Sequence, residues 1–281
     1  MLPRYGDHCE EPCSVVAVAA LSLCPTEICK LTSIIVVLIF VQMFAREMPY
    51  AKFILPTAPA QPVTMNMGMR MNSWYDIVGL DERSNENCKG IVESRAMLEG
   101  ILAKEHADTG LPYSRMVLAG FSQGGALSLF TGLQLKADQK LAGVVVLSGY
   151  LPAASQFTIT PGLEDVPVWH GHGDQDMMVR PELADKSREA VLAKGLKSYE
   201  IHKYPCGHTV DMDELQATMA FLKKVLPPDD SCRIQLKDPA NMSIKELKAA
   251  IRKAGLNSQA VGFTEKREFI ELIRNHRDGK L

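Results

Sequence analysis

The fold of this chain is indicated by the stretch Leu118-Ala119-Gly120-Phe121-Ser122-Gln123-Gly124-Gly125, in which a serine stands between glycines. The apolar run 116–119 precedes the serine, and the helix-compatible run 125–135 follows it. This order predicts a strand, a sharp turn and a helix, with the serine hydroxyl raised above the end of the strand. Glycines suit the turn because a Cβ beside the serine would collide with the neighbouring strand or helix. The backbone N–H of Gln123 would then face an oxyanion formed at the serine.

The composition is that of a globular protein with a large core. The chain has 281 residues, 46% of them hydrophobic, which is enough for one large domain and a small one. Its net charge of −2 predicts no general attraction to nucleic acid or to an anionic membrane. The seven cysteines are scattered, and the close pairs Cys9/Cys13 and Cys24/Cys29 lack a second pair at zinc spacing. We therefore expect free thiols in a reducing compartment, the cytoplasm, and no metal site.

Strands and helices alternate along the middle of the chain. Apolar or alternating runs predict strands at 52–55, 116–119, 141–148, 166–170 and 197–204. Helical patterns separate or follow them, at 91–107, 125–135, 181–194 and 212–225. Strands separated by helices predict an α/β fold with a doubly wound, mostly parallel sheet and helices on both faces. In such sheets the functional residues gather at the carboxyl ends of the strands.

A nucleophile, an acid and a base follow predicted strands in that order. Asp176 comes 54 residues after Ser122, and His208 comes 86 residues after it. A Ser-His-Asp triad needs a serine nucleophile, a histidine that takes its proton and an acid that orients the histidine. Because all three residues lie directly after strands, we expect them to meet at one edge of the sheet.

Other residues compete for the acid and base roles. Asp174 is the alternative acid, but we expect it to cap its turn by accepting bonds from backbone N–H groups. His202 lies within the last strand, and His170 and His172 come before any suitable acid. His208 lies in a loop beside a glycine, where its ring is free to reach a neighbouring strand end, so it is the expected base.

Residues 1–48 do not fit the alternation. The run 31–45 is uncharged but shorter than the roughly 18–20 residues that span a bilayer. Its β-branched centre, residues 34–41, indicates a fully buried strand or a core helix. The alternatives are a membrane anchor formed by 31–45 and an abnormal segment, such as one from a faulty gene model. A cleaved secretory signal is not expected, because charged residues lie near the start and the apolar run is interrupted.

A methionine-rich polar loop is expected at residues 60–76. Thioether side chains repack easily, so Met67 and Met69, together with Trp74, are candidates for an adaptable apolar lining around a substrate chain. The alternative is that these methionines only fill the surface and the core.

Five motifs in this order resemble the acyl-protein thioesterase, lysophospholipase and carboxylesterase family of α/β-hydrolases, over residues 48–227. The motifs are Pro56-Thr57-Ala58-Pro59, Ser73-Trp74-Tyr75-Asp76, Gly120-Phe121-Ser122-Gln123-Gly124-Gly125, His172-Gly173-Asp174-Gln175-Asp176 and Gly207-His208. The resemblance implies an α/β-hydrolase fold with Ser122, Asp176 and His208 as the triad, and it favours Asp176 over Asp174.

The same resemblance implies an activity and a substrate class. The family cleaves acyl thioesters on protein cysteines, lysophospholipid esters and small carboxylic esters through an acyl-enzyme, without a metal or organic cofactor. It implies S-acylated proteins or lipid and small esters as substrates, with transient contact to a membrane surface. It also implies that the 62–74 loop borders the acyl-chain site.

One family feature is missing from the sequence. The family has a strand that ends in His-Gly-x-Gly-Asp, a loop that supplies the second oxyanion N–H, but no glycine occurs between Asp7 and Met67. The remnant Arg4-Tyr5-Gly6-Asp7 would make Tyr5 the second donor, and the strand that should precede it would then be absent. A lost donor costs on the order of 10²–10³ in rate. The alternative function is therefore a weakly active or inactive relative that acts as a binding protein.

The chain ends in a separate helical module. We divide the sequence into residues 1–48, a hydrolase domain 49–227, a linker 228–240 and a module 241–281. Ser243 and Glu246 form a capping box for a first helix, and Thr264 is the expected cap of a second.

The module resembles the helix–extended–helix SAP-like fold, including the C-terminal domain of the mesencephalic astrocyte-derived neurotrophic factor family. The resemblance rests on residues 244–248, Gly255 and residues 265–269. The nine Lys/Arg and five Asp/Glu of residues 241–281 give a net charge of +4, which permits nucleic-acid binding. Docking to a protein is the alternative that we favour, and the oligomeric state is not predicted.

Overall fold

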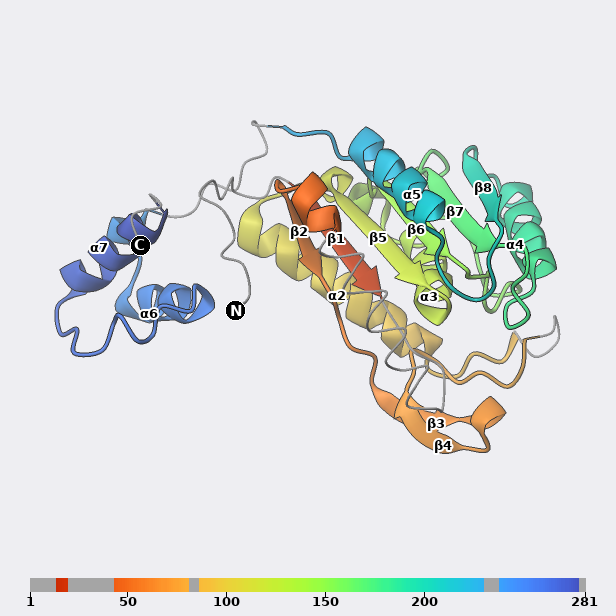
Figure 1. Ribbon diagram of the computed structural model, residues 1–281, viewed down its shortest axis with the longest axis horizontal. Helices are drawn as coiled ribbons and strands as arrows, with labels where there is room; N and C mark the ends of the chain where they lie inside the picture. The colour runs from red at the N-terminus through yellow and green to blue at the C-terminus, as the bar shows by residue number, and fades with distance from the viewer. Residues whose placement is uncertain (1–13, 20–42, 81–85, 230–237, 278–281) are drawn as a thin grey trace. The chain divides into compact units, whose positions relative to one another are not determined.

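The described part of the chain forms two compact units (Figure 1). The computed structural model describes residues 14–19, 43–80, 86–229 and 238–277, and for 14–19 it describes the backbone alone. One unit lies within residues 14–229, and the other comprises 238–277. The domain boundaries expected from the sequence stay predictions.

A six-stranded parallel sheet forms the centre of the larger unit. Its order is β2-β1-β5-β6-β7-β8, and every neighbouring pair of strands runs parallel. The strands are β1 (Ser14–Ala19), β2 (Ala51–Ile54), β5 (Met116–Phe121), β6 (Gly143–Leu147), β7 (Val168–Gly173) and β8 (Tyr199–Tyr204). β6 is buried along its whole length, as expected for a strand covered on both faces. The predicted α/β fold with a mainly parallel sheet is confirmed.

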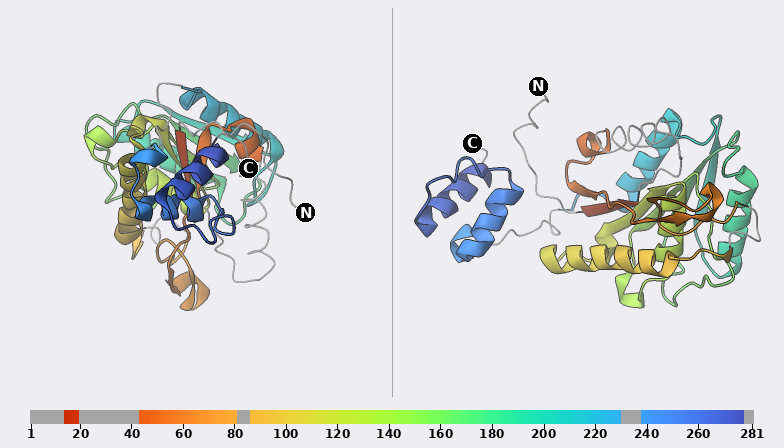
Figure 2. Two further views of the ribbon diagram at one scale, coloured as in Figure 1. Left: turned by 90° about the vertical axis from the view of Figure 1, so that its left-hand side faces the viewer. Right: turned by 90° about the horizontal axis from the view of Figure 1, so that it is seen from below.

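Helices cover both faces of this sheet (Figures 1 and 2). The long helices are α2 (Ile91–Thr109), α3 (Gln123–Gly132), α4 (Pro181–Ala193) and α5 (Met212–Val225). On the α3 face, Val144 and Val146 lie against glycines of that helix. On the opposite face, Trp169 and Val145 share a core cluster with Phe221 and Leu222 of α5. The central strands of the sheet are therefore buried, and functional residues are expected in the loops at the carboxyl ends of the strands.

The strand beside the elbow strand is β1, which follows residues 4–7 in the sequence and does not precede them. Ala19 at its carboxyl end lies opposite Gly120 of β5, and its other edge pairs with β2. The buried strand or core helix expected at residues 34–41 falls outside the described residues. The strand at residues 14–19 was not predicted from the sequence, because a short apolar run does not by itself distinguish a strand from other buried segments.

Residues 43–47, the end of the anchor candidate 31–45, are helical and belong to the larger unit. Phe44 and Met48 are fully buried and pack in the same cluster as Leu222. Glu47 accepts a bond from Lys223 of α5 at 2.7 Å. Of the helices that the structure describes, none combines the length and the hydropathy needed to cross a membrane.

The methionine-rich segment is a hairpin and not the loop expected from the sequence. β3 (Ala60–Val63) pairs antiparallel with β4 (Met69–Asn72), with Val63 opposite Met69. A short 3-10 turn, η1 (Thr64–Asn66), joins them, and Met67 adopts a left-handed backbone at φ 55°. The alternation that marks a strand is hidden here by Pro62 and by the exposed methionines, because neither face of the hairpin is uniformly apolar.

The smaller unit contains two amphipathic helices, α6 (Ile244–Lys253) and α7 (Lys266–Arg277). Ser243 and Glu246 form the expected capping box. At the second helix the Glu268 carboxylate accepts the backbone N–H groups of Thr264 and Glu265. The core comprises Met242, Leu247, Ile251, Leu256, Phe269, Leu272 and Ile273. The SAP-like assignment stays a prediction.

The remaining described elements are single 3-10 turns. They are η3 (Tyr113–Arg115), η4 (Ala137–Gln139) and η6 (Pro239–Asn241).

Candidate active site

The elbow after β5 holds Ser122 in a strained backbone conformation. Its φ is 54° and its ψ is −122°, a region that side-chain-bearing residues rarely adopt. A Cβ at Gly120 would lie 2.2 Å from the carbonyl carbon of Gly124, so the start of the turn admits only glycine. Gln123 is the first residue of α3, and its backbone N–H therefore has no acceptor within the helix. The turn thus presents a hydroxyl and a free N–H at the carboxyl edge of the sheet.

Three residues from three loops meet at this edge. His208 Nε2 lies 3.0 Å from Ser122 Oγ, and His208 Nδ1 lies 2.7 Å from Asp176 Oδ2. Ser122 and Asp176 are buried, whereas the His208 side chain keeps 16% of its surface exposed. The structure therefore brings together the nucleophile, base and acid that the sequence nominated, in bonding order.

Asp176 is fixed by its own turn as well as by His208. Its Oδ1 accepts the backbone N–H groups of Met178 and Val179, at 2.9 and 2.8 Å. Burial raises the pKa of Asp176, but the bonds from His208 and the two amides outweigh burial and leave its pKa below the usual value. Asp174 is exposed, and the turn-capping role expected for it belongs to Asp176.

The loop that carries His208 approaches β7 backbone to backbone. A Cβ on Gly173 would lie 2.3 Å from the Cys206 carbonyl oxygen and 2.4 Å from that of Gly207. The Phe121 ring packs against the imidazole of His208 at a centroid distance of 4.9 Å. Burial, followed by the charge of Glu214, raises the pKa of the Cys206 thiol to about 11, so this neighbour of the base stays a thiol at neutral pH.

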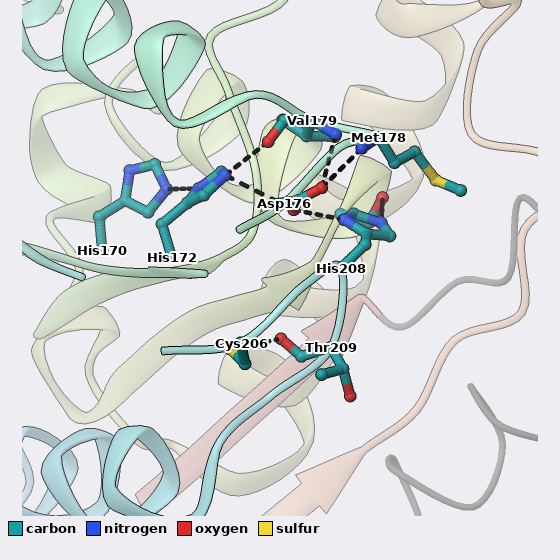
Figure 3. A network of polar contacts seen from close by, with 9 residues as sticks. His170, His172, Asp176, Met178, Val179, Cys206, His208 and Thr209 are labelled. Carbon is teal, nitrogen blue, oxygen red and sulfur yellow. Dashed lines mark hydrogen bonds and ion pairs between the residues drawn. The ribbon is translucent and has the colours of Figure 1, made fainter. Parts of the chain in front are cut away.

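Two histidines that the sequence analysis set aside lie behind the acid (Figure 3). His172 Nε2 is 3.6 Å from Asp176 Oδ2, and His172 Nδ1 is 3.2 Å from His170 Nε2. Both rings are fully buried on β7. The available signal was their two-residue spacing on a buried strand, which places both on one face; their order relative to the acid was the wrong criterion.

The segment after the hairpin is tied to the elbow by the side chain of Gln123. Its Oε1 accepts the Trp74 backbone N–H at 2.9 Å, and its Nε2 donates to the Tyr75 carbonyl at 2.7 Å. Trp74 is completely buried, whereas Met67 is 95% and Met69 is 51% exposed. Of the three residues expected to line a substrate site, Trp74 is therefore buried, whereas Met67 and Met69 are exposed.

The second oxyanion donor cannot be assigned to a described residue. Tyr5, the candidate from the sequence, lies outside the described residues. β1 ends at Ala19, opposite Gly120 of the elbow strand, so the chain leaves the sheet beside the elbow. Within the described ranges, no group of three or more His, Cys, Asp or Glu side chains is arranged to hold a metal ion.

Comparison with known sequences gives a consistent set of relatives. The sequence profile of the phospholipase/carboxylesterase family matches residues 36–226. Acyl-protein thioesterase 1 of Neurospora crassa is 40% identical over 186 residues, which cover 63% of this chain and 74% of that protein. Acyl-protein thioesterase 1 homolog 1 of Dictyostelium discoideum is 36% identical over 183 residues, or 65% of this chain and 80% of that protein.

Solved structures share the fold. Arabidopsis thaliana SOBER1 has a TM-score of 0.61 at 27% identity, with 75% of this chain and 98% of that chain covered. Zea mays acyl-protein thioesterase 2 has a TM-score of 0.61 at 24% identity, with 80% and 97% covered. At 24% identity, the similarity to the Zea mays structure shows only that the fold is shared.

Proposed function

The chain belongs to the phospholipase/carboxylesterase family of α/β-hydrolases, and from that premise we propose that Ser122, His208 and Asp176 are its catalytic triad. The protein is a serine hydrolase of carboxylic esters or thioesters. The observation that carries the triad assignment is the continuous pair of contacts from Ser122 Oγ to His208 at 3.0 Å and from His208 to Asp176 at 2.7 Å.

The proposed mechanism has two halves that share these residues. His208 Nε2 takes the proton of Ser122 as its Oγ attacks the acyl carbonyl, and Asp176 stabilises the imidazolium. The proton then passes to the departing thiolate or alkoxide, which leaves an acyl group on Ser122. Water, deprotonated by the same imidazole, attacks that acyl-enzyme; as the bond between the acyl carbon and Ser122 Oγ breaks, the imidazolium returns the proton to Oγ and the carboxylic acid is released. Asp176 holds the Nδ1–H tautomer throughout.

The oxyanion is proposed to bind the backbone N–H of Gln123, which is free at the start of α3. The second donor that we propose is the backbone N–H of Tyr5, which lies outside the described residues. The partial positive charge at the N-terminus of α3 adds to the same field.

The proposed substrates are acyl thioesters on protein cysteines, with lipid and small esters as further substrates. The Neurospora crassa and Dictyostelium discoideum relatives, at 40% and 36% identity, are named as acyl-protein thioesterase 1 and a homolog of it, which supports this class. We propose that Met67 and Met69 contact the acyl chain and that Trp74 supports them from within the core. The exposure of Met67 and Met69 also allows transient contact with a membrane surface that carries the substrate. We further propose that the protein is located in the cytoplasm.

The test compares the full chain with Ser122→Ala on a p-nitrophenyl ester and on an S-acylated peptide. We expect the substitution to lower turnover by at least about 10⁴-fold, while the circular dichroism spectrum stays unchanged. A serine-reactive fluorophosphonate should label the native chain and not the variant. Equal hydrolysis by the two proteins would remove the enzyme assignment and favour a non-catalytic binding protein.

The smaller unit, residues 238–277, is proposed to be a docking module for another protein. Nucleic acid is the alternative partner, because the C-terminal 41 residues carry a net charge of +4. Binding of the full chain to duplex DNA at about 50 mM salt, weakening steeply as salt rises, would favour the alternative.

A further inference from the structure

A chain of buried polar groups runs along one face of the sheet to the acid of the triad (Figure 3). Tyr199 of β8 lies 2.8 Å from His170 Nδ1, and His170 Nε2 lies 3.2 Å from His172 Nδ1. His172 Nε2 lies 2.7 Å from the Val179 carbonyl oxygen. Neither imidazole takes part in the hydrolytic steps. Burying two imidazoles is costly unless their nitrogens are satisfied, and here all four nitrogens have partners.

The Val179 carbonyl, at one end of this hydrogen-bonded series, determines which atom of each residue carries the proton. The Val179 carbonyl can only accept, so His172 must carry its proton on Nε2. A neutral His172 then has a bare Nδ1, which requires a donated bond from His170 Nε2–H. His170 in turn has a bare Nδ1, which accepts the hydroxyl proton of Tyr199. The three residues therefore form a one-way series of donors that ends at the turn carrying Asp176.

Val179 links this series to the acid. Its carbonyl accepts the bond from His172, while its N–H donates to Asp176 Oδ1 at 2.8 Å. The same peptide segment is thus held from two sides, once by the sheet and once by the carboxylate. The His172 Nε2–H also lies 3.6 Å from Asp176 Oδ2, too far for a hydrogen bond, where its dipole favours the ionised carboxylate.

Burial keeps both rings neutral. Burial lowers the pKa of His170 far below its usual value, and His172 lowers it further. Burial also lowers the pKa of His172, although its bond to Val179 and the charge of Asp176 act in the opposite direction. The other charged groups acting on His172 are His208 and Lys203, and Lys203 is paired with Asp185 of α4 at 2.6 Å.

We propose that His172 is a positioning residue for the triad: fixed in its Nε2–H form by the Val179 carbonyl, with its bare Nδ1 satisfied by His170, it holds the Val179 peptide and thereby aims Asp176 at His208. This inference rests on the proposed function, since it assigns a support to the proposed acid. It gives a reason for an imidazole at this point, because an apolar side chain of similar size would leave the Val179 carbonyl and His170 Nε2 unpaired in the core.

The first test replaces His172 in two ways. His172→Leu removes the donor, and we expect kcat to fall about 10- to 100-fold with KM within twofold, because the acid is displaced by a fraction of an ångström to about 1 Å. The acid limb of the pH profile of kcat/KM should move to lower pH, since a displaced Asp176 stabilises the imidazolium less. His172→Gln keeps an N–H donor for Val179, and we expect kcat within about fivefold of the parent and an unmoved acid limb.

A histidine of the same sheet serves as the matched control. His202 of β8 stacks on Trp169, and 46% of its side chain is exposed. It is not a member of the donor series, so His202→Gln should leave kcat and the acid limb of the pH profile unchanged. The proposal is overturned if His172→Leu folds and turns over within threefold of the parent. It is also overturned if Leu and Gln lower kcat equally with an unmoved acid limb, because that result describes a structural role alone.

The second test needs no turnover. Nitrogen-15 spectra of histidine-labelled Ser122→Ala protein report the protonated nitrogen of each ring. We expect His170 and His172 both to be neutral Nε2–H tautomers at pH 7.5. A charged His172 at this pH, or an Nδ1–H tautomer, overturns the inference even if His172→Leu fails to fold. If the native chain is inactive but these spectra are as expected, the proposed function fails and the donor series stands.

Discussion

The two sides of the carboxyl edge of the sheet are built in opposite ways. On the acid–base side, Asp176 is 1% exposed, and each of its carboxylate oxygens has a hydrogen-bond partner. On the hairpin side, Met67 is 95% exposed and has a left-handed backbone at the tip between β3 and β4. A reacting geometry must be held within a fraction of an ångström, whereas an acyl chain needs only a yielding apolar surface. If the hairpin contacts the acyl chain as proposed, the chemistry and the substrate contact place separate demands on neighbouring loops.

The two sides are joined through the elbow. Gln123 contributes its backbone N–H to the catalytic side and its side chain to the segment that follows the hairpin. A substitution confined to the acid–base side or to the hairpin side should therefore change one property of the protein. A substitution of Gln123, which contacts both sides, should change two.

The largest effect is expected when the acid loses its charge. Asp176→Asn should lower kcat by about 10⁴-fold with KM nearly unchanged, because an amide can hold His208 in the wrong tautomer and cannot stabilise the imidazolium. Steady-state hydrolysis of a p-nitrophenyl ester measures it. Asp174→Asn, two residues away and exposed, is the matched control and should stay within twofold. A comparable loss in the control would show that the acid has been misassigned.

A substitution of Gln123 should lower both the stability and the activity of the protein. Gln123→Ala leaves the buried Trp74 N–H without its acceptor and opens a small cavity, so the free energy of unfolding should fall by about 4 kcal/mol. Urea denaturation of the purified variant gives this value. Gln175→Ala on the exposed turn should change it by less than about 0.5 kcal/mol. A Gln123 variant as stable as the parent would mean that the two sides are independent.

Beneath the acid–base side, Glu214 should make stability depend on pH. Burial raises the pKa of Glu214 to about 7 from 4.5, and its Oε1 has no hydrogen-bond partner. Between these values the folded state keeps the proton and the unfolded state loses it, so stability falls as pH rises from 4.5 to 7, by at most about 3 kcal/mol.

Glu214→Gln should remove this slope while preserving the acceptor for the Asp211 N–H at the start of α5. Denaturation at pH 5 and pH 8 gives the comparison: the variant should gain stability relative to the parent at pH 8 only. Equal pH slopes for the two proteins would show that Glu214 is ionised throughout.

The smallest effect is expected on the hairpin. Met67→Gln should raise KM about threefold for a long-chain ester and leave an acetyl ester unaffected, because only a long chain reaches the tip. Its unfolding free energy should change by less than about 0.5 kcal/mol, since Met67 is almost fully exposed. The acetyl ester is the internal control. An equal change for both esters would place Met67 away from the acyl chain.

The sequence predicted the catalytic side of the fold well because its signals are local. The Gly120–Gly125 turn forces a strand-to-helix elbow. Asp176 follows a buried strand and His208 an alternating one, and parallel pairing places their ends at one edge of the sheet. The capping box at Ser243 is equally local and was predicted correctly.

Long-range choices could not be read in this way. The strand at residues 14–19 pairs with β5, about a hundred residues further along the sequence, and no local pattern predicts that pairing. The hairpin was missed because its strands are mostly exposed and lack a clear alternation. His170 and His172 were set aside because their importance depends on burial and on a carbonyl that a later turn brings back to β7.

The near contact of Gly173 with the carbonyls of Cys206 and Gly207 has a consequence for how this protein can vary. At this point the loop before Asp176 and the loop that carries His208 are spaced by direct contact of their main chains. No side chain lies between Gly173 and these carbonyls that could be exchanged for a larger or smaller one. Substitution at this point can abolish the interval but cannot adjust it. We therefore expect variation in substrate preference to occur at the hairpin across the edge, where exposed side chains can change while the spacing of the reacting groups stays the same.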